Sequence, residues 1–392
     1  MMLQADYQDG TPGAAGTDMT QSGGPGSLYA SALLVLVVFA VASRSLVISA
    51  AALGAGIVLV LRSLDVLLAA PPREKYLLVG TACILTLSLP FAVLRSETAL
   101  AHFFVTLLSL LTAFLLTRSL EAYFQASRVA LYASIGVVAA YLATSGLANF
   151  PLERMIPDSS SNGITSYLVI LQANYCVASY LNRGRLPLLS TLLTLGICVV
   201  GYGRGSILSA TVIIAANFMT FALRKNPRHF FVAIGLCTAV AGGLAVAYGE
   251  QISLFVEANT KIGSGLYDRH RDAIIQDYSS KIDDDSLAIL AGADYRNTVI
   301  ELDYNNNPHN SYIRAHHIFG LPYLALMLLF PLLSSLRLPW RLRAYPLALA
   351  AVMLFRAATE PILFPTMLDV FFFSVCFMMP RAAQRRPGAT HG

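Results

Sequence analysis

The sequence predicts an all-α, polytopic membrane protein with about 12 transmembrane helices. Charged residues make up only 12% of the 392 residues, whereas soluble domains carry about 25%. Hydrophobic residues make up 56%, and the mean hydropathy is +0.62. Charge is therefore too sparse to cover a soluble surface of this size, which excludes an ordinary soluble enzyme and a disordered chain.

Twelve apolar runs account for the predicted helices, because a helix needs about 20 apolar residues to cross a bilayer. They are expected at residues 28–43, 46–69, 76–94, 98–117, 129–148, 163–181, 186–202, 205–223, 229–248, 311–334, 345–363 and 365–379. The first and last runs are short, so 10 or 11 spans remain open. Residues 1–27 are rich in Gly, Ser, Thr and Asp and predict a disordered cytoplasmic tail, which leaves residues 28–392 as a single integral membrane domain.

The distribution of Lys and Arg predicts the orientation of these spans. One set of loops and the C-terminal tail hold most of the basic residues: Arg73, Lys75, Arg118, Arg128, Arg183, Arg185, Arg224, Lys225, Arg228, Arg337, Arg341, Arg343, Arg381, Arg385 and Arg386. The opposite short loops hold Arg44, Arg95, Arg154 and Arg204. Cytoplasmic loops carry the excess of basic residues, so both termini are expected inside and the long loop at 249–310 outside. This loop holds 11 of the 22 acidic residues, and its length is typical of functional loops.

The first candidate site is the predicted outer turn Gly201-Tyr202-Gly203-Arg204-Gly205-Ser206. Glycines permit a tight turn with unusual backbone angles. An arginine beside the free amides of a following helix N-terminus favours anion binding. The alternative is an interfacial arginine whose side chain reaches lipid phosphates.

The second candidate lies in the long loop, in the run Gly263-Ser264-Gly265-Leu266-Tyr267-Asp268-Arg269-His270-Arg271-Asp272. Arg269 and Arg271 would supply positive charge to a diphosphate. The interleaved Asp268 and Asp272 favour the alternative of a local salt-bridge network. The segment around 273–275 predicts a short amphipathic helix suited to lying on the membrane surface.

The third candidate is Asn307-Pro308-His309-Asn310-Ser311-Tyr312-Ile313, where the long loop meets the run at 311–334. Asn310 or Ser311 is expected to cap the helix that follows. His309 would then lie at the membrane interface, where a neutral imidazole can accept a proton from a sugar hydroxyl. The alternative is a loop histidine without a chemical role.

Ionisable residues inside predicted spans form a further group of candidates. Arg314 and His317 are three residues apart and share a helix face, whereas His316 points elsewhere. Arg356 and Glu360 are four residues apart and predict an ion pair within one helix. The cysteines and histidines lack metal-ligand spacing, so we expect a site without metal or cofactor. The dispersed basic residues do not indicate nucleic-acid binding.

Together these motifs resemble the O-antigen ligase and O-antigen polymerase superfamily, which are bacterial membrane glycosyltransferases with a GT-C-type helical fold. The resemblance covers about residues 186–335. It rests on Gly203-Arg204-Gly205, where the family has Ser-Arg-Gly, on Pro308-His309-Asn310, and on the later Gly320-Leu321. It implies catalytic roles for Arg204, Arg269 and His309, with Arg271 as the second choice for the loop arginine. The expected substrate-binding residues are Arg204, Arg269, Arg271, Asn310, Tyr312, Arg314 and His317.

The resemblance also implies the reaction. The donor would be a glycan on undecaprenyl diphosphate, and the acceptor a second glycan or the lipid A core. Transfer would be metal-independent and inverting, at the periplasmic face of the bacterial inner membrane. A polysaccharide polymerase and an O-antigen ligase both remain open. Membrane lipid and a protein that regulates chain length are the other expected partners.

A transporter or flippase of lipid-linked glycan is the alternative from a different class. Arg356, Glu360 and the histidines within predicted spans would then form a substrate or proton path. Transporters often contain two related halves, but residues 28–202 and 205–379 show no internal repeat. The late position of the long loop also disfavours transport.

Overall fold

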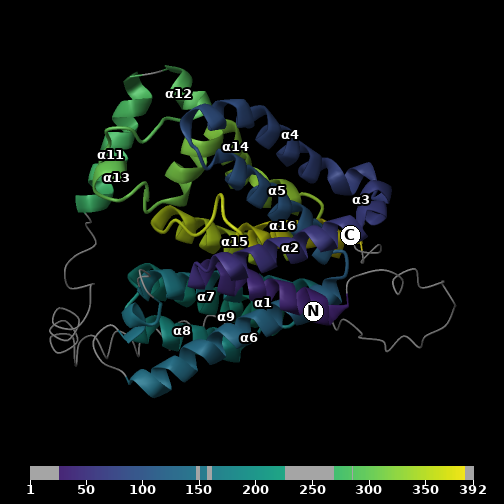
Figure 1. Cartoon of the computed structure of the whole chain (residues 1–392). Helices are drawn as coiled ribbons and strands as arrows, with labels where there is room; N and C mark the ends of the chain where they lie inside the picture. The colour runs from purple at the N-terminus through teal and green to yellow at the C-terminus, as the bar shows by residue number, and fades with distance from the viewer. Residues whose placement is uncertain (1–25, 147–150, 157–160, 226–268, 285, 385–392) are drawn as a thin grey trace.

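The computed structural model describes residues 26–146, 151–156, 161–225, 269–284 and 286–384. These segments contain α-helices and one 3-10 helix but no β-strand, which confirms the all-α prediction for this part of the chain (Figure 1). The predicted tail at 1–27, apart from its last two residues, lies outside the described residues. The run at 229–248 and loop residues 249–268 also lie outside them.

The helices follow the predicted apolar runs closely. Their bounds are α1 Ser27–Ser43, α2 Leu46–Arg62, α3 Leu64–Ala69, α4 Pro72–Arg95, α5 Ala99–Leu116, α6 Leu120–Ser145, η1 Pro151–Arg154, α7 Ser161–Arg183, α8 Leu188–Val200, α9 Arg204–Lys225, α11 Arg269–Asp284, α12 Ser286–Ala291, α13 Val299–Leu302, α14 Ser311–Ser335, α15 Trp340–Thr359 and α16 Asp369–Gln384. Among the described residues, seven of these helices are long and apolar enough to cross a membrane: α4, α5, α6, α7, α9, α14 and α15. Helices α1, α2 and α8 are apolar but shorter.

The described helices form a bundle whose two ends differ. In Figure 1, α11 and α13 lie at the left-hand end, whereas α1 begins and α16 ends toward the right-hand end. We call these the loop end and the opposite end. The sidedness predicted from the basic residues stays a prediction.

The predicted run at 46–69 is not one continuous helix. It divides at Ser63 into α2 and the short α3, and Ser63 itself is buried. Arg62 and Asp65 on either side of the break are exposed. The polar residues that interrupt this run therefore mark a helix boundary rather than a buried ion pair inside a span.

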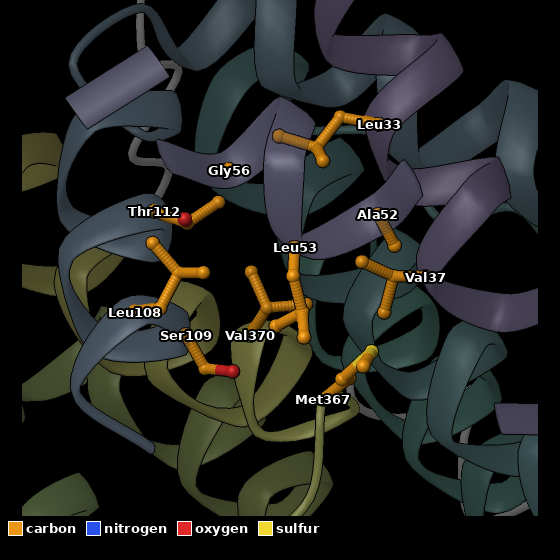
Figure 2. A pocket seen from close by; sticks show the side chains of 10 residues that line it. All are labelled: Leu33, Val37, Ala52, Leu53, Gly56, Leu108, Ser109, Thr112, Met367 and Val370. Atoms are coloured by element: carbon orange, nitrogen blue, oxygen red, sulfur yellow. The ribbon is translucent and has the colours of Figure 1, made fainter. Parts of the chain in front are cut away.

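The interior of the bundle is filled by close packing. Helix α1 packs on α6, α6 on α7, α4 on α14, and α5 on α16. A cavity of about 20 Å³ lies between α1, α2, α5 and the start of α16. Figure 2 shows the side chains that line it. Its lining includes Leu33, Val37 and Leu53, and a Cβ on Gly56 would lie 3.3 Å from Leu108. A space of this size and polarity is a packing defect rather than a ligand site.

The helices of the long loop have a small core of their own. Ile274 and Tyr278 of α11 are buried together with Ala288, Ala293, Tyr295 and Ile300. Ile274 and Tyr278 therefore face the rest of the loop, and the location of α11 on the membrane surface stays a prediction. Ile275 remains 47% exposed.

Candidate functional site

The Gly201–Ser206 turn is packed tightly between two helices at the loop end. A Cβ on Gly203 would lie 2.6 Å from Oγ1 of Thr165 in α7. A Cβ on Gly205 would overlap the Nη1 atom of Arg356 in α15. Side chains larger than hydrogen therefore do not fit at either position. Arg204 stands between these glycines as the first residue of α9.

A buried arginine lies directly against this turn. Arg356 is 2% exposed, and its Nη2 donates to Oγ of Ser166 in α7. Its Nη1 donates to Oγ1 of Thr359 at 2.8 Å. Its Nε has no hydrogen-bond partner among the described residues. Arg356 therefore places a fixed positive charge beside the glycine-rich turn that carries Arg204.

Glu360 joins three elements at the same place. It ends α15 in an extended conformation, and its Oε1 lies 3.4 Å from Nη2 of Arg271 in α11. Its carbonyl oxygen accepts a hydrogen bond of 2.7 Å from Oγ of Ser311, the first residue of α14. The expected pair of Glu360 with Arg356 within one helix is thus replaced, in the described residues, by an ion pair with the loop. Arg356 still interacts with Glu360 electrostatically.

The segment before α14 is held in a defined conformation. Oδ1 of Asn310 accepts hydrogen bonds from the amides of Tyr312 at 2.7 Å and Ile313 at 3.3 Å, which confirms the predicted cap. His309 has a φ of +49°, and its amide donates to Oδ1 of Asn307 at 3.1 Å. Positive φ is uncommon outside glycine, so the backbone turns sharply at His309. The hydroxyl of Tyr312 donates to the carbonyl of Leu354 at 2.6 Å and joins α14 to α15.

Arg314 and His317 line a second space, which we call the polar cavity. It has a volume of about 400 Å³ and lies between the α4–α5 turn, residues 295–306 and α14. Nη2 of Arg314 donates to the carbonyls of Pro361 at 2.6 Å and Leu363 at 2.8 Å. The turn after Glu360 therefore separates the polar cavity from the cluster of Arg356, Glu360 and Arg271.

Two histidines of α14 attach the loop to the bundle. Nε2 of His316 donates to the carbonyl of Ile289, and Nδ1 accepts from the hydroxyl of Tyr278 at 2.8 Å. Burial raises the pKa of Tyr278, which keeps this hydroxyl a donor. His317 donates through Nδ1 to the carbonyl of Ala293 at 2.6 Å, and its ring stacks on Tyr295 with centroids 3.8 Å apart.

Several predicted residues come together at the loop end, and the placement of one is not described. The turn with Arg204, Arg271 and the segment at 309–311 all meet residues of the Arg356–Glu360 region. Arg269 is the first residue of α11, but its side chain lies outside the described residues. Sequence reasoning missed Ser166 and the cavity residues Arg95, His102 and Tyr295. Arg95 could have been singled out as a candidate, because it is a basic residue at a helix end in a loop with few other charges.

Comparison with known proteins does not assign this chain to a family: no family model matches it, and no curated protein is significantly similar to it. Among the residues that the structure describes, no three His, Cys, Asp or Glu side chains are arranged to hold a metal ion. The case for a function therefore rests on the sequence motifs and on the geometry at the loop end.

Proposed function

We propose that this protein is a membrane glycosyltransferase that transfers a glycan from undecaprenyl diphosphate to a glycan acceptor at the outer face of the membrane. One observation carries the proposal. The Gly203-Arg204-Gly205 turn, helix α11 and the segment that follows His309 converge on Arg356 and Glu360. These three segments are far apart in the sequence, and each carries a residue whose chemistry suits glycosyl transfer from a diphosphate.

The charges at this place suit a diphosphate leaving group. Cleavage of a glycosyl diphosphate develops negative charge on the departing phosphate, and fixed cations stabilise that charge more in the transition state than in the ground state. Guanidinium binds two phosphate oxygens and stays charged. Arg204 is the proposed phosphate ligand, and Arg356, which packs against Gly205 of the same turn, adds a buried positive charge. The loop arginines Arg269 and Arg271 would add charge from α11.

His309 is the proposed general base. The acceptor hydroxyl must lose a proton as it attacks the anomeric carbon, and imidazole is the side chain best suited to accept it near neutral pH. Attack by the acceptor on the face opposite the diphosphate gives inversion. The positive φ of His309 supports a positioned side chain, since sparsely populated backbone conformations cluster at functional sites.

A transporter remains the second candidate, and the distribution of buried charge disfavours it. A proton path needs ionisable groups in succession through the bundle. In the described part of the chain, Arg356, Glu360 and Asp369 are buried where α15 ends and α16 begins. The other buried arginine, Arg381, donates to Thr117 at the far end of α16. The described residues provide no buried Asp, Glu, His, Lys or Arg side chain in α16 between Asp369 and Arg381.

The proposal is tested with full-length protein in lipid nanodiscs, supplied with an undecaprenyl-diphosphate oligosaccharide and an acceptor glycan. The buffer contains a chelator and no nucleotide. Wild type is expected to form product, and Arg204→Gln and His309→Ala are expected to reduce the rate at least 100-fold. Arg128→Gln, an exposed arginine on α6, is the control and should retain the rate. Wild-type rates in both site variants would contradict the mechanism, and the length of the products separates polymerase from ligase.

A further inference from the structure

The polar cavity is distinct from the proposed diphosphate site. The turn at 360–364 lies between them, because Glu360 meets Arg271 while Pro361 and Leu363 hold Arg314 through their carbonyls. A volume of about 400 Å³ lies within the usual range for small-molecule sites. Most of its lining side chains carry a hydrogen-bonding group, which is unusual for a pocket beside apolar helices.

The more buried part of the lining is positively charged. Arg95, Arg314 and His102 are half-buried there, and His317 is buried. Arg314 uses Nε and Nη2 to bind the turn, and Nη1 makes no hydrogen bond within the described residues. Asp369 acts on Arg314 electrostatically, but its own oxygens accept from backbone amides of the same turn. A positive charge is thus available on the cavity wall.

The exposed part of the lining is mixed in charge. Glu97 and Glu301 bring two carboxylates, Arg296 brings one guanidinium, and Thr98 and Asn306 bring a hydroxyl and an amide. Groups of this kind exchange hydrogen bonds with sugar hydroxyls. The cavity therefore presents hydroxyl-binding groups at its rim and guanidinium deeper inside.

We propose that the polar cavity binds an acidic saccharide, with a sugar carboxylate against Arg314 and Arg95 and the sugar hydroxyls against the rim. Guanidinium pairs with carboxylate through two parallel hydrogen bonds, and this pairing gives orientation as well as affinity. His309, the proposed base, lies five residues before Arg314 in the sequence, and a glycan bound in the cavity would be the acceptor. The role of the cavity as an acceptor subsite rests on the proposed function, whereas binding of an acidic saccharide to the cavity does not.

The test measures binding to the full-length protein in nanodiscs by calorimetry, with trigalacturonate as the acidic probe and maltotriose as the neutral probe. We expect trigalacturonate to bind at least tenfold more tightly than maltotriose. Ser96 lines the cavity, so Ser96→Asp would add a negative charge and should weaken trigalacturonate at least tenfold, while the isosteric Ser96→Asn should not. Thr98→Trp should obstruct both probes, and Leu302→Trp, on an exposed residue outside the lining, should affect neither.

Three outcomes would overturn the inference. They are equal affinity for the two probes, equal weakening of trigalacturonate by Ser96→Asp and Ser96→Asn, and absence of trigalacturonate binding. No donor lipid or transfer is needed for this measurement, so its result is independent of the rate assay. Binding without transfer would reject the proposed function alone, and transfer without binding would reject only this inference.

Discussion

Arg271 in the long loop and Glu360 at the end of α15 form an ion pair, with Nη2 and Oε1 3.4 Å apart. The arginine side chain is 37% exposed and the glutamate side chain 9% exposed, so the pair lies at the boundary between the loop and the bundle. Within the described part of the chain, it joins α11 to the end of α15, near the glycine-rich turn that Arg356 contacts. Loss of the pair should therefore affect the site more than it affects the fold.

We expect Arg271→Gln to lower the free energy of unfolding by about 1 kcal/mol, because Arg271 is partly exposed and Glu360 keeps its electrostatic interaction with Arg356. Glycan transfer should nevertheless fall at least tenfold, since the positive charge that Arg271 places beside Glu360 would be lost. Lys281→Gln is the matched control, because Lys281 also lies in α11 and pairs with Asp294 at 3.9 Å. Thermal unfolding and the initial transfer rate are measured for both. Equal transfer rates in the two variants would contradict a role for Arg271.

Gly205→Ala is expected to displace Arg356 and reduce transfer more than tenfold. The new Cβ would overlap Nη1 of a buried side chain, and overpacking of this kind costs about 1–3 kcal/mol. Gly196→Ala in α8 is the control, because its Cβ would meet nothing within 4 Å. Alanine should stabilise that helix by up to about 1 kcal/mol. Loss of activity in both variants would show that the effect is not specific to Arg356.

Variants at Asn310 distinguish a role in helix capping from a role in substrate binding. Asn310→Ala should cost about 1 kcal/mol of stability, whereas Asn310→Ser and Asn310→Asp should retain most of it, because these residues also cap helices. If Asn310 serves only as a cap, transfer follows stability across the three variants. A transfer rate that falls in Asn310→Ser while the melting temperature is preserved would assign Asn310 a contact with substrate.

The orientation of the bundle is tested by labelling of single cysteines. In a cysteine-free background, Leu302→Cys should react with an impermeant maleimide in intact spheroplasts, since Leu302 is 72% exposed in the long loop. Trp340→Cys, at a residue 77% exposed at the start of α15, should react only after lysis. The reverse pattern would place the long loop in the cytoplasm and would exclude an outer site.

Local features of this protein could be predicted well from its sequence. The run at 311–334 corresponds to α14 at Ser311–Ser335, and Asn310 caps it as expected. Both follow from chemistry within a few residues, namely apolar side chains that favour a helix and an amide side chain that accepts from free backbone N–H groups.

Contacts between distant segments could not be predicted in this way. Ser166 and Arg356 are 190 residues apart, and nothing in either helix identifies the other as its partner. The pairing of Glu360 with Arg271 was missed because α15 ends at Thr359, which removes the helical spacing on which the expected pair with Arg356 depended. The polar cavity combines three segments, and no local pattern marks its walls. Apolar periodicity predicts which face is buried but not which helix covers it.

Gly320 divides α14 into two parts with different attachments. Its φ of +74° and ψ of −176° are not helical, and a Cβ there would overlap the carbonyl oxygen of Leu290 in α12. The nine residues before it bind the loop through His316 and His317, and they bind the end of α15 through Ser311 and Tyr312. The residues after it belong to the bundle. The start of α14 is therefore a joint between the long loop and the bundle, so a change in the loop sequence at Ile289 or Ala293 acts on the same short helical segment that carries Arg314.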